Sequence, residues 1–233
     1  REGPGLFSEI AKKKGMRMKI CRPFLGEELI IPKQNDLLLI MGGPMGVKDR
    51  EKIEYKWLNK EIDLIKYVIS NQIAMIGVCL GAQLLAHATG GKIEPLRQGK
   101  PLRKKPEIGW GKIKFISSPN TIYLRKDSEK SLNVLHWHGE RINLPDSSIL
   151  LASSKNCKEQ VFTIGKKAFG LQCHLEVTDK MAYRWIEEDS AFITSAFGEK
   201  GIDIISKQQN IFGKASEESR LNELENLFNF LLG

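Results

Sequence analysis

The segment AMIGVCLGAQLLAHATGG, residues 74–91, limits the possible folds of this chain more than any other. Its first residues are apolar and end at Val78, and the run from Leu80 to Thr89 predicts a helix that two glycines close. A buried strand that turns directly into a helix is the building unit of a parallel sheet covered by helices. We therefore expect an α/β fold, with this turn at the carboxyl end of a central strand.

Strand-like and helix-like segments also alternate through the rest of the first half. Apolar runs at 16–22 and 36–42 predict strands, and apolar residues at helical spacing predict helices at 6–14 and 53–69. The turn EGPG, residues 2–5, opens the first helix with no strand before it. The sheet therefore begins either in residues ahead of the first helix or in a different way from this pattern.

The second half has more strand character. Strands are expected at 112–117, 133–138, 148–153, 160–165 and 168–177, the last two joined by a hairpin. Helices return at 178–192, where Thr178 is placed to cap the first turn, and from Ser216 onward. No repeat or linker separates these segments, so the sequence predicts a single domain over residues 1–233.

Composition narrows the class of protein. The 233 residues are 41% hydrophobic and 27% charged, and no apolar run is long enough to cross a bilayer. The N-terminus lacks a secretory apolar segment and the four cysteines lack metal-ligand spacing, so we expect reduced thiols and a cytoplasmic location. The net charge of +8 is densest at 97–105, which is either a solvated loop or a contact for an anion. Nucleic-acid binding is not expected, because no aromatic ladder adjoins this loop.

Cys79 stands at the corner between the expected strand and helix, with Gly77 and Gly81 two residues away on either side. At such a corner the side chain projects above the sheet edge, and the helix N-terminus favours a thiolate. The amide of Leu80 would also point at the atom that the sulfur attacks. Alternatively, Cys79 is a small buried residue and Gly81 eases packing. This pattern alone leaves both interpretations open.

Two further segments favour a nucleophile. His174 and Glu176 lie two residues apart at the end of an expected strand, so their side chains share one face. Glu176 could then orient the imidazole toward a thiol. Gly43 follows the strand expected at 36–42 and can donate a second amide to an oxyanion, since Pro44 has no N–H.

In this order, GGP at 42–44, GVCLGAQ at 77–83 and QCHLE at 172–176 resemble the motifs of the class I (triad) glutamine amidotransferases. HWHGE at 136–140 is similar to a segment in the amidotransferase domain of GMP synthase. The resemblance implies a flavodoxin-like α/β fold, with a mostly parallel sheet and helices on both faces. Many relatives have QFHPE where this chain has QCHLE, and we expect Cys173 to fill the core on the opposite sheet face.

The resemblance also implies a role for each motif residue. Cys79 would be the nucleophile, His174 the general base and acid, and Glu176 its orienting carboxylate. The amides of Gly43 and Leu80 would form the oxyanion hole. The thiolate would attack the γ-carboxamide of glutamine, ammonia would leave, and water would hydrolyse a γ-glutamyl thioester. No metal or organic cofactor is implied.

The residues that choose the substrate are less defined. Gln83 would hold the amino-acid end of the substrate. His138 and Glu140 either line the entrance and select the substrate, or His138 is a polar residue satisfied at a strand end. No phosphate-binding loop is present, so a synthase that consumes the ammonia would be a separate chain. Two alternatives stay open: a γ-glutamyl hydrolase or peptidase acting on γ-glutamyl amines or glutathione-like conjugates, and a non-catalytic interaction module of the same fold.

Overall fold

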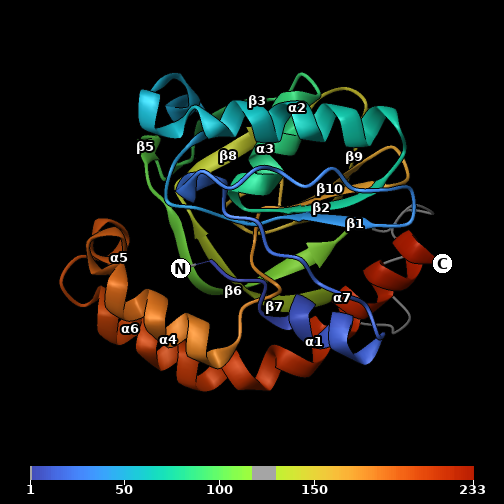
Figure 1. Ribbon diagram of the computed structural model, residues 1–233. Coiled ribbons are helices and arrows are strands. Elements are labelled where there is room, and N and C mark those ends of the chain that lie inside the picture. The colour runs from blue at the N-terminus through green and yellow to red at the C-terminus, as the bar shows by residue number, and fades with distance from the viewer. Residues whose placement is uncertain (1, 117–129) are drawn as a thin grey trace.

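The structure is a computed structural model that describes residues 2–116 and 130–233. A curled seven-stranded sheet forms its centre, in the order β1-β2-β11-β10-β9-β6-β7 (Figure 1). Its strands are β1 (Leu37–Ile40), β2 (Ala74–Val78), β6 (Glu107–Phe115), β7 (Ser131–His138), β9 (Ser148–Ser153), β10 (Val161–Ile164) and β11 (Ala168–Leu171). Two small sheets pair β3 (Lys92–Pro95) with β8 (Glu140–Asn143), and β4 (Arg97–Gln98) with β5 (Arg103–Lys104).

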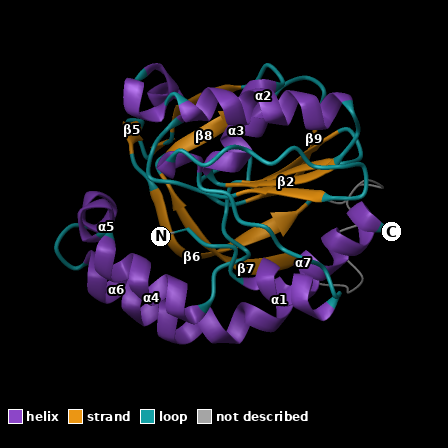
Figure 2. Cartoon of the chain, in the orientation of Figure 1, coloured by secondary structure: helices purple, strands orange, loops and turns teal. Residues whose placement is uncertain are grey.

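Helices lie on both faces of this sheet (Figure 2). They are α1 (Leu6–Lys13), α2 (Trp57–Ser70), α3 (Leu80–Ala88), α4 (Asp179–Glu188), α5 (Ser190–Phe197), α6 (Gly201–Gln208) and α7 (Glu217–Leu232). Helices α2 and α3 cover one face, α1 and α7 cover the other, and α4 to α6 pack beside β6 and β7 (Figure 1). None of the described helices is both long and apolar enough to span a bilayer.

The direction of the strands changes across the sheet. β1 pairs with β2, and β2 pairs with β11, in parallel. The remaining neighbours in the sheet, β11–β10, β10–β9, β9–β6 and β6–β7, are antiparallel. The expected α/β fold with helices on both faces is confirmed, and its parallel part is the part that carries Cys79. In open α/β sheets, ligands bind at the carboxyl ends of such parallel strands.

β2 shows how the sheet joins the two layers of helices. All five of its residues are buried. Ala74, Ile76 and Val78 belong to the core shared with α1 and α7, whereas Met75 belongs to the core under α2 and α3. Successive side chains of a strand point to opposite faces, so a strand covered on both faces must be apolar throughout.

The prediction of a strand at residues 16–22 is wrong. These residues have no regular secondary structure, and the Ile20 side chain is 56% exposed. A strand needs a neighbour that exchanges backbone hydrogen bonds with it. In the described part of the sheet, β1 is the edge strand and nothing pairs with residues 16–22.

Two other expected elements are shorter than predicted. β11 ends at Leu171 instead of residue 177, and only an isolated bridge between Leu135 and His174 continues the pairing among the described residues. The helix expected at 178–192 is interrupted at Asp189, although Thr178 caps it as predicted by accepting the amide of Met181. Residue 117, the end of another expected strand, lies outside the described residues. Helix α6 was not expected.

The corner at Cys79 depends on close packing of backbone against backbone. Cys79 has φ 51° and ψ −105°, a left-handed φ that residues with a side chain seldom adopt. A Cβ on Gly77 would lie 2.4 Å from the carbonyl oxygen of Gly81, and one on Gly81 would lie 2.0 Å from that of Ile40. The two glycines therefore allow α3 to rest directly on the ends of β1 and β2.

Because of this packing, we expect a single methyl group added at Gly81 to destabilise the protein. Gly81→Ala should lower the free energy of unfolding by about 3 kcal/mol, because the added carbon overlaps the backbone of β1. Urea denaturation followed by circular dichroism measures the loss. Gly3→Ala is the matched control, since nothing lies within 4 Å of its added Cβ. Equal stability of the two variants would contradict the packing argument.

Candidate active site

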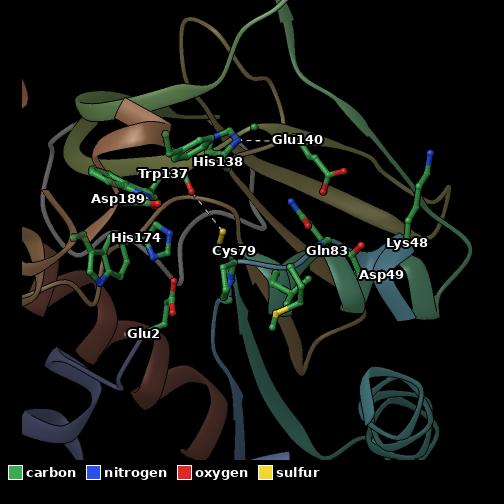
Figure 3. Close-up of a pocket in the computed structure, with 18 residues that line it drawn as sticks. Glu2, Lys48, Asp49, Cys79, Gln83, Trp137, His138, Glu140, His174 and Asp189 are labelled. Atoms are coloured by element: carbon green, nitrogen blue, oxygen red, sulfur yellow. Dashed lines mark hydrogen bonds between the residues drawn. The ribbon is translucent and has the colours of Figure 1, made fainter. Parts of the chain in front are cut away.

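A pocket of about 410 Å³ lies at the corner formed by Cys79. Its wall contains seven of the eight residues that the sequence predicts for the site: Gly43, Cys79, Leu80, Gln83, His138, Glu140 and His174. The eighth, Glu176, lies behind His174. Figure 3 shows Cys79 near the centre, with His174 on one side and Gln83 and Glu140 on the other.

His174 and Glu176 form a buried pair. Nδ1 of His174 lies 2.8 Å from Oε1 of Glu176. Burial is the largest influence on the imidazole and opposes its charge, but the negative charge of Glu176, the hydrogen bonds of Cys79 and Glu176, and the charge of Cys79 together outweigh it and raise the pKa of His174 to about 10. His174 therefore carries a proton at neutral pH, beside the sulfur. The edge of the Trp185 ring, with centroids 4.7 Å apart, packs against the imidazole.

Two other groups approach the sulfur of Cys79. Nε2 of Gln172 lies 3.7 Å from Sγ, and the carbonyl oxygen of Trp137 lies 3.9 Å from it. Gln172 also accepts a hydrogen bond of 3.2 Å from Nε2 of Gln83, so Gln83 is connected to the sulfur through Gln172. Gln172 is not among the residues expected from the sequence. Its place two residues before His174 is the signal that could have revealed it.

The predicted oxyanion donors lie beside this sulfur. Gly43 and Leu80 both line the pocket with Cys79. A Cβ on Gly43 would lie 2.6 Å from Sδ of Met45 and 3.2 Å from Cδ2 of Leu80, so a side chain there would require the Met45 side chain to move. The same test on Gly42 meets Cβ of Cys79 at 3.3 Å and Cε1 of His174 at 3.6 Å. This turn is therefore packed between Cys79 and the imidazole of His174.

The pocket wall carries charges on both sides of Cys79. On the side of His174 lie Glu2 and Asp189, and on the opposite side lie Asp49, Glu140 and Lys48 (Figure 3). Burial raises the pKa of Glu140, while the charge of Lys48 opposes this shift. Four carboxylates thus stand against one ammonium group and the imidazolium of His174 in this wall, an excess of negative charge that favours a substrate carrying positive charge.

Trp137 binds the acidic residue Asp189 at the pocket wall. Its Nε1 donates a hydrogen bond of 2.7 Å to Oδ2 of Asp189. Its ring packs against Trp185 and Phe192, with centroids 5.8 and 6.4 Å apart. Trp137, Trp185, Asp189 and Phe192 all line the pocket, although none was singled out from the sequence. Apart from Trp137, which lies within HWHGE, no local motif marks them, because they come together only when α4 and α5 pack on β7.

His138 is held by hydrogen bonds at both ring nitrogens. Nδ1 lies 2.8 Å from the carbonyl oxygen of Glu140, which fixes Nδ1 as the donor. Nε2 lies 3.3 Å from Oε2 of Glu107 and 3.3 Å from Nε2 of Gln160. The ring therefore lines the pocket while its polar atoms are satisfied by the protein, and selection of the substrate by His138 stays a prediction.

Glu107, His138 and Cys157 form a second buried set of a carboxylate, an imidazole and a thiol, with possible metal-ligand atoms within 4.8 Å of one another. Hydrogen bonds from Ser154 and Gln160 to Glu107 account for this arrangement without a metal ion. Burial raises the pKa of Cys157 to about 12, so this thiol stays neutral at physiological pH. The cluster supports His138 from behind and lacks the features of a nucleophilic site.

Comparison with known proteins agrees with the motifs. The family model described as glutamine amidotransferase class-I matches residues 9–191. The chain is 27% identical to the glutamine amidotransferase-like protein YfeJ of Salmonella typhimurium, over 89% of this chain and 85% of that one. It is 30% identical to the GMP synthase of Wigglesworthia glossinidia brevipalpis over 74% of this chain, but this match spans only 32% of the synthase.

Solved structures extend the similarity to the whole chain. A crystal structure of a glutamine amidotransferase from Thermotoga maritima has a TM-score of 0.81 and 26% identity, and covers 99% of this chain and 93% of its own. A glutamine amidotransferase from Methylobacillus flagellatus has a TM-score of 0.82 at 21% identity, covering 99% of this chain and 90% of its own. The second of these shows the shared fold alone.

The buried side chain of His136, behind the pocket, should make the stability of the protein depend on pH. Burial lowers the pKa of His136 to about 4, although the charge of Glu107 opposes this shift. An unfolded histidine has a pKa near 6.5, so the unfolded chain binds more protons between these values and stability is lost as the pH falls from about 6.5 to 4. Urea denaturation should show that the free energy of unfolding decreases by up to about 3 kcal/mol over this pH range because of this group. The His136→Asn variant should lack this part of the decrease. An identical pH dependence of both proteins would contradict the assignment.

Proposed function

We propose that this chain, which belongs to the class I glutamine amidotransferase family, hydrolyses the γ-carboxamide of glutamine through a thioester on Cys79. One observation carries the proposal. Cys79, His174 and the amide-bearing residues Gly43 and Leu80 line one pocket, and Glu176 binds the far side of the imidazole at 2.8 Å. A nucleophile, a proton carrier, its orienting carboxylate and two oxyanion donors are the complete set that acyl transfer from an amide requires.

The charge state of His174 determines how the first step would proceed. Cys79 would attack as a thiolate, and because the adjacent His174 carries a proton at neutral pH, the imidazolium is available as the proton donor. Sγ of Cys79 would bond to the amide carbon while the amides of Gly43 and Leu80 stabilise the oxyanion. His174 would then give its proton to the amide nitrogen, the C–N bond would break, and ammonia would leave.

The second step restores the enzyme. Neutral His174 would take a proton from water as the hydroxide bonds to the thioester carbon, and glutamate would leave as the C–S bond breaks. Glu176 would keep the imidazole oriented in both steps and stabilise its charged form. Ammonia is either released or passed to an acceptor, and a separate synthase chain would be the partner that uses it.

Glutamine hydrolysis tests the first part of this proposal. The intact protein should release ammonia from glutamine, Cys79→Ala should abolish the release, and Glu176→Gln should lower kcat by about 10²-fold or more, because the imidazole loses its charged partner. Cys21→Ala is the matched control, since Cys21 lies outside the pocket wall and hydrogen bonds to the carbonyl of Glu28. Ammonia release that survives in Cys79→Ala would refute the mechanism.

The walls around His174 favour a second candidate, a γ-glutamyl hydrolase with a larger leaving group. The leaving nitrogen must receive its proton from His174, so the rest of the leaving group lies on that side of Cys79. Glu2, Asp189 and Trp137 line the same side (Figure 3), and the ring of Phe192, also in the pocket wall, packs against Trp137. Ammonia has no part that could contact two carboxylates and two aromatic rings. A γ-glutamyl amine whose leaving group is a cation would contact all of them.

A series of leaving groups distinguishes the two candidates. Glutamine, a γ-glutamyl diamine and a γ-glutamyl amino acid present a neutral, a cationic and an anionic leaving group. If the second candidate is correct, kcat/KM for the diamine should exceed that for the amino acid by about tenfold or more. Asp189→Asn keeps an oxygen that can accept the bond from Trp137 but loses the charge, and should reduce this ratio. A preference for glutamine over both amides would instead support the glutaminase.

A further inference from the structure

The segment that carries Glu176 is held outside the sheet ladder. β11 ends at Leu171, and residues 172–177 are irregular apart from the bridge at His174. The position of the carboxylate is therefore not fixed by the pleat of a strand. Backbone carbonyls in a buried segment still need hydrogen-bond donors. The residues that supply these donors determine where Glu176 lies.

Two elements far away in the sequence supply them. The amide of Leu6, at the start of α1, donates a hydrogen bond of 2.8 Å to the carbonyl of Glu176. One guanidinium nitrogen of Arg220, on α7, donates to the carbonyls on either side, 2.8 Å from that of Leu175 and 2.5 Å from that of Val177. The three consecutive carbonyls around the carboxylate are thus all bound, and Arg220 binds two of them.

Arg220 is itself fixed on all sides. It is completely buried, its other terminal nitrogen donates to the carbonyl of Gly213 at 3.2 Å, and its Nε donates to Oγ of Ser216 at 3.2 Å. The guanidinium carbon lies 5.0 Å from the centre of the Trp110 ring. A planar group that makes four directed hydrogen bonds on a stacked surface has little freedom to move.

Arg220 occupies a core position of α7. Arg220 is buried on the same face of the helix as Leu224, Leu227 and Leu231. Burial lowers the pKa of Arg220 to about 10 while the charge of Glu176 opposes this shift, so the side chain is charged at neutral pH. A charge in the core costs stability unless it is fully paired. A charged residue at this core position therefore calls for a reason other than apolar packing.

We infer that Arg220 is a positioning residue for the active site, which holds the backbone on both sides of Glu176 so that the carboxylate stays against His174. This inference rests on the proposed role of the Cys79–His174–Glu176 set. Arg220 lies beyond residue 191, where the match to the family model ends, so the family motifs do not assign it this role. Without Arg220, the carboxylate would move away from His174, and the imidazolium beside Cys79 would lose its stabilising charge.

The test compares Arg220→Met and Arg220→Lys with Leu224→Ala, a core truncation one turn further along α7. Each intact protein is assayed for melting temperature, for kcat and KM with glutamine, and for the rate of Cys79 alkylation by iodoacetamide against pH. Arg220→Met should lower kcat by about tenfold or more with KM nearly unchanged, and should slow alkylation at neutral pH while moving its profile to higher pH. For Arg220→Lys, both kcat and the alkylation profile should lie between those of the parent protein and those of Arg220→Met. Leu224→Ala should lower the melting temperature as much as Arg220→Met does, but its alkylation rate should depend on pH as in the parent protein.

A double-mutant cycle separates positioning from general destabilisation. If Arg220 acts through Glu176, adding Arg220→Met to Glu176→Gln should change kcat and alkylation by less than about twofold. Additive losses in the double variant would overturn the inference, and so would an Arg220→Met protein that matches Leu224→Ala in every readout. Alkylation does not require a substrate, so failure of the glutaminase proposal would leave this outcome readable. Arg220→Lys retains the charge and keeps the test valid if the methionine variant does not fold.

Discussion

The structure depends on one strained corner of backbone, at Cys79. Its φ of 51° and ψ of −105° place the residue outside the regions open to ordinary side chains, at a cost of about 1–3 kcal/mol. Packing of α3 against the ends of β1 and β2 offsets this cost, and the packing is possible only because Gly77 and Gly81 have no side chains. The corner places the sulfur, the amide of Leu80 and the turn at Gly43 at one edge of the sheet. The pocket forms where these elements meet.

The two halves of the site are positioned in different ways. Regular elements position the nucleophile, since Cys79 joins a buried strand directly to a helix. The imidazole and its carboxylate lie past the end of β11, where no ladder sets their direction. A charged side chain from the last helix and an amide from the first helix hold that segment instead. Regular secondary structure thus positions the sulfur, whereas hydrogen bonds from residues distant in the sequence position His174 and Glu176.

This difference explains what the sequence could predict. The strand at 74–78, the helix after it and the motif residues follow from local patterns, and the structure brings seven of the eight predicted residues to one pocket. The spacing of His174 and Glu176 suggested a strand pleat, but the observed contact is made in an irregular segment. Asp189 and Arg220 were missed because each acquires its meaning from a contact across the fold, whereas Gln172 stands in the quoted motif QCHLE but was not assigned a role. The segment at 16–22 was mistaken for a strand because an apolar run does not reveal whether a pairing partner lies beside it.

The path of the last helix has a consequence for where the molecule can be divided. The match to the family model ends at residue 191, yet Leu224, Leu227 and Phe228 belong to the core beneath β2, where Phe228 stacks on Phe7 of the first helix. A fragment cut where this match ends would expose that core and lose the arginine behind Glu176. The end of the family match is therefore not a boundary of cooperative unfolding. Substitutions in the last helix can retune the carboxylate without altering any residue that a substrate touches.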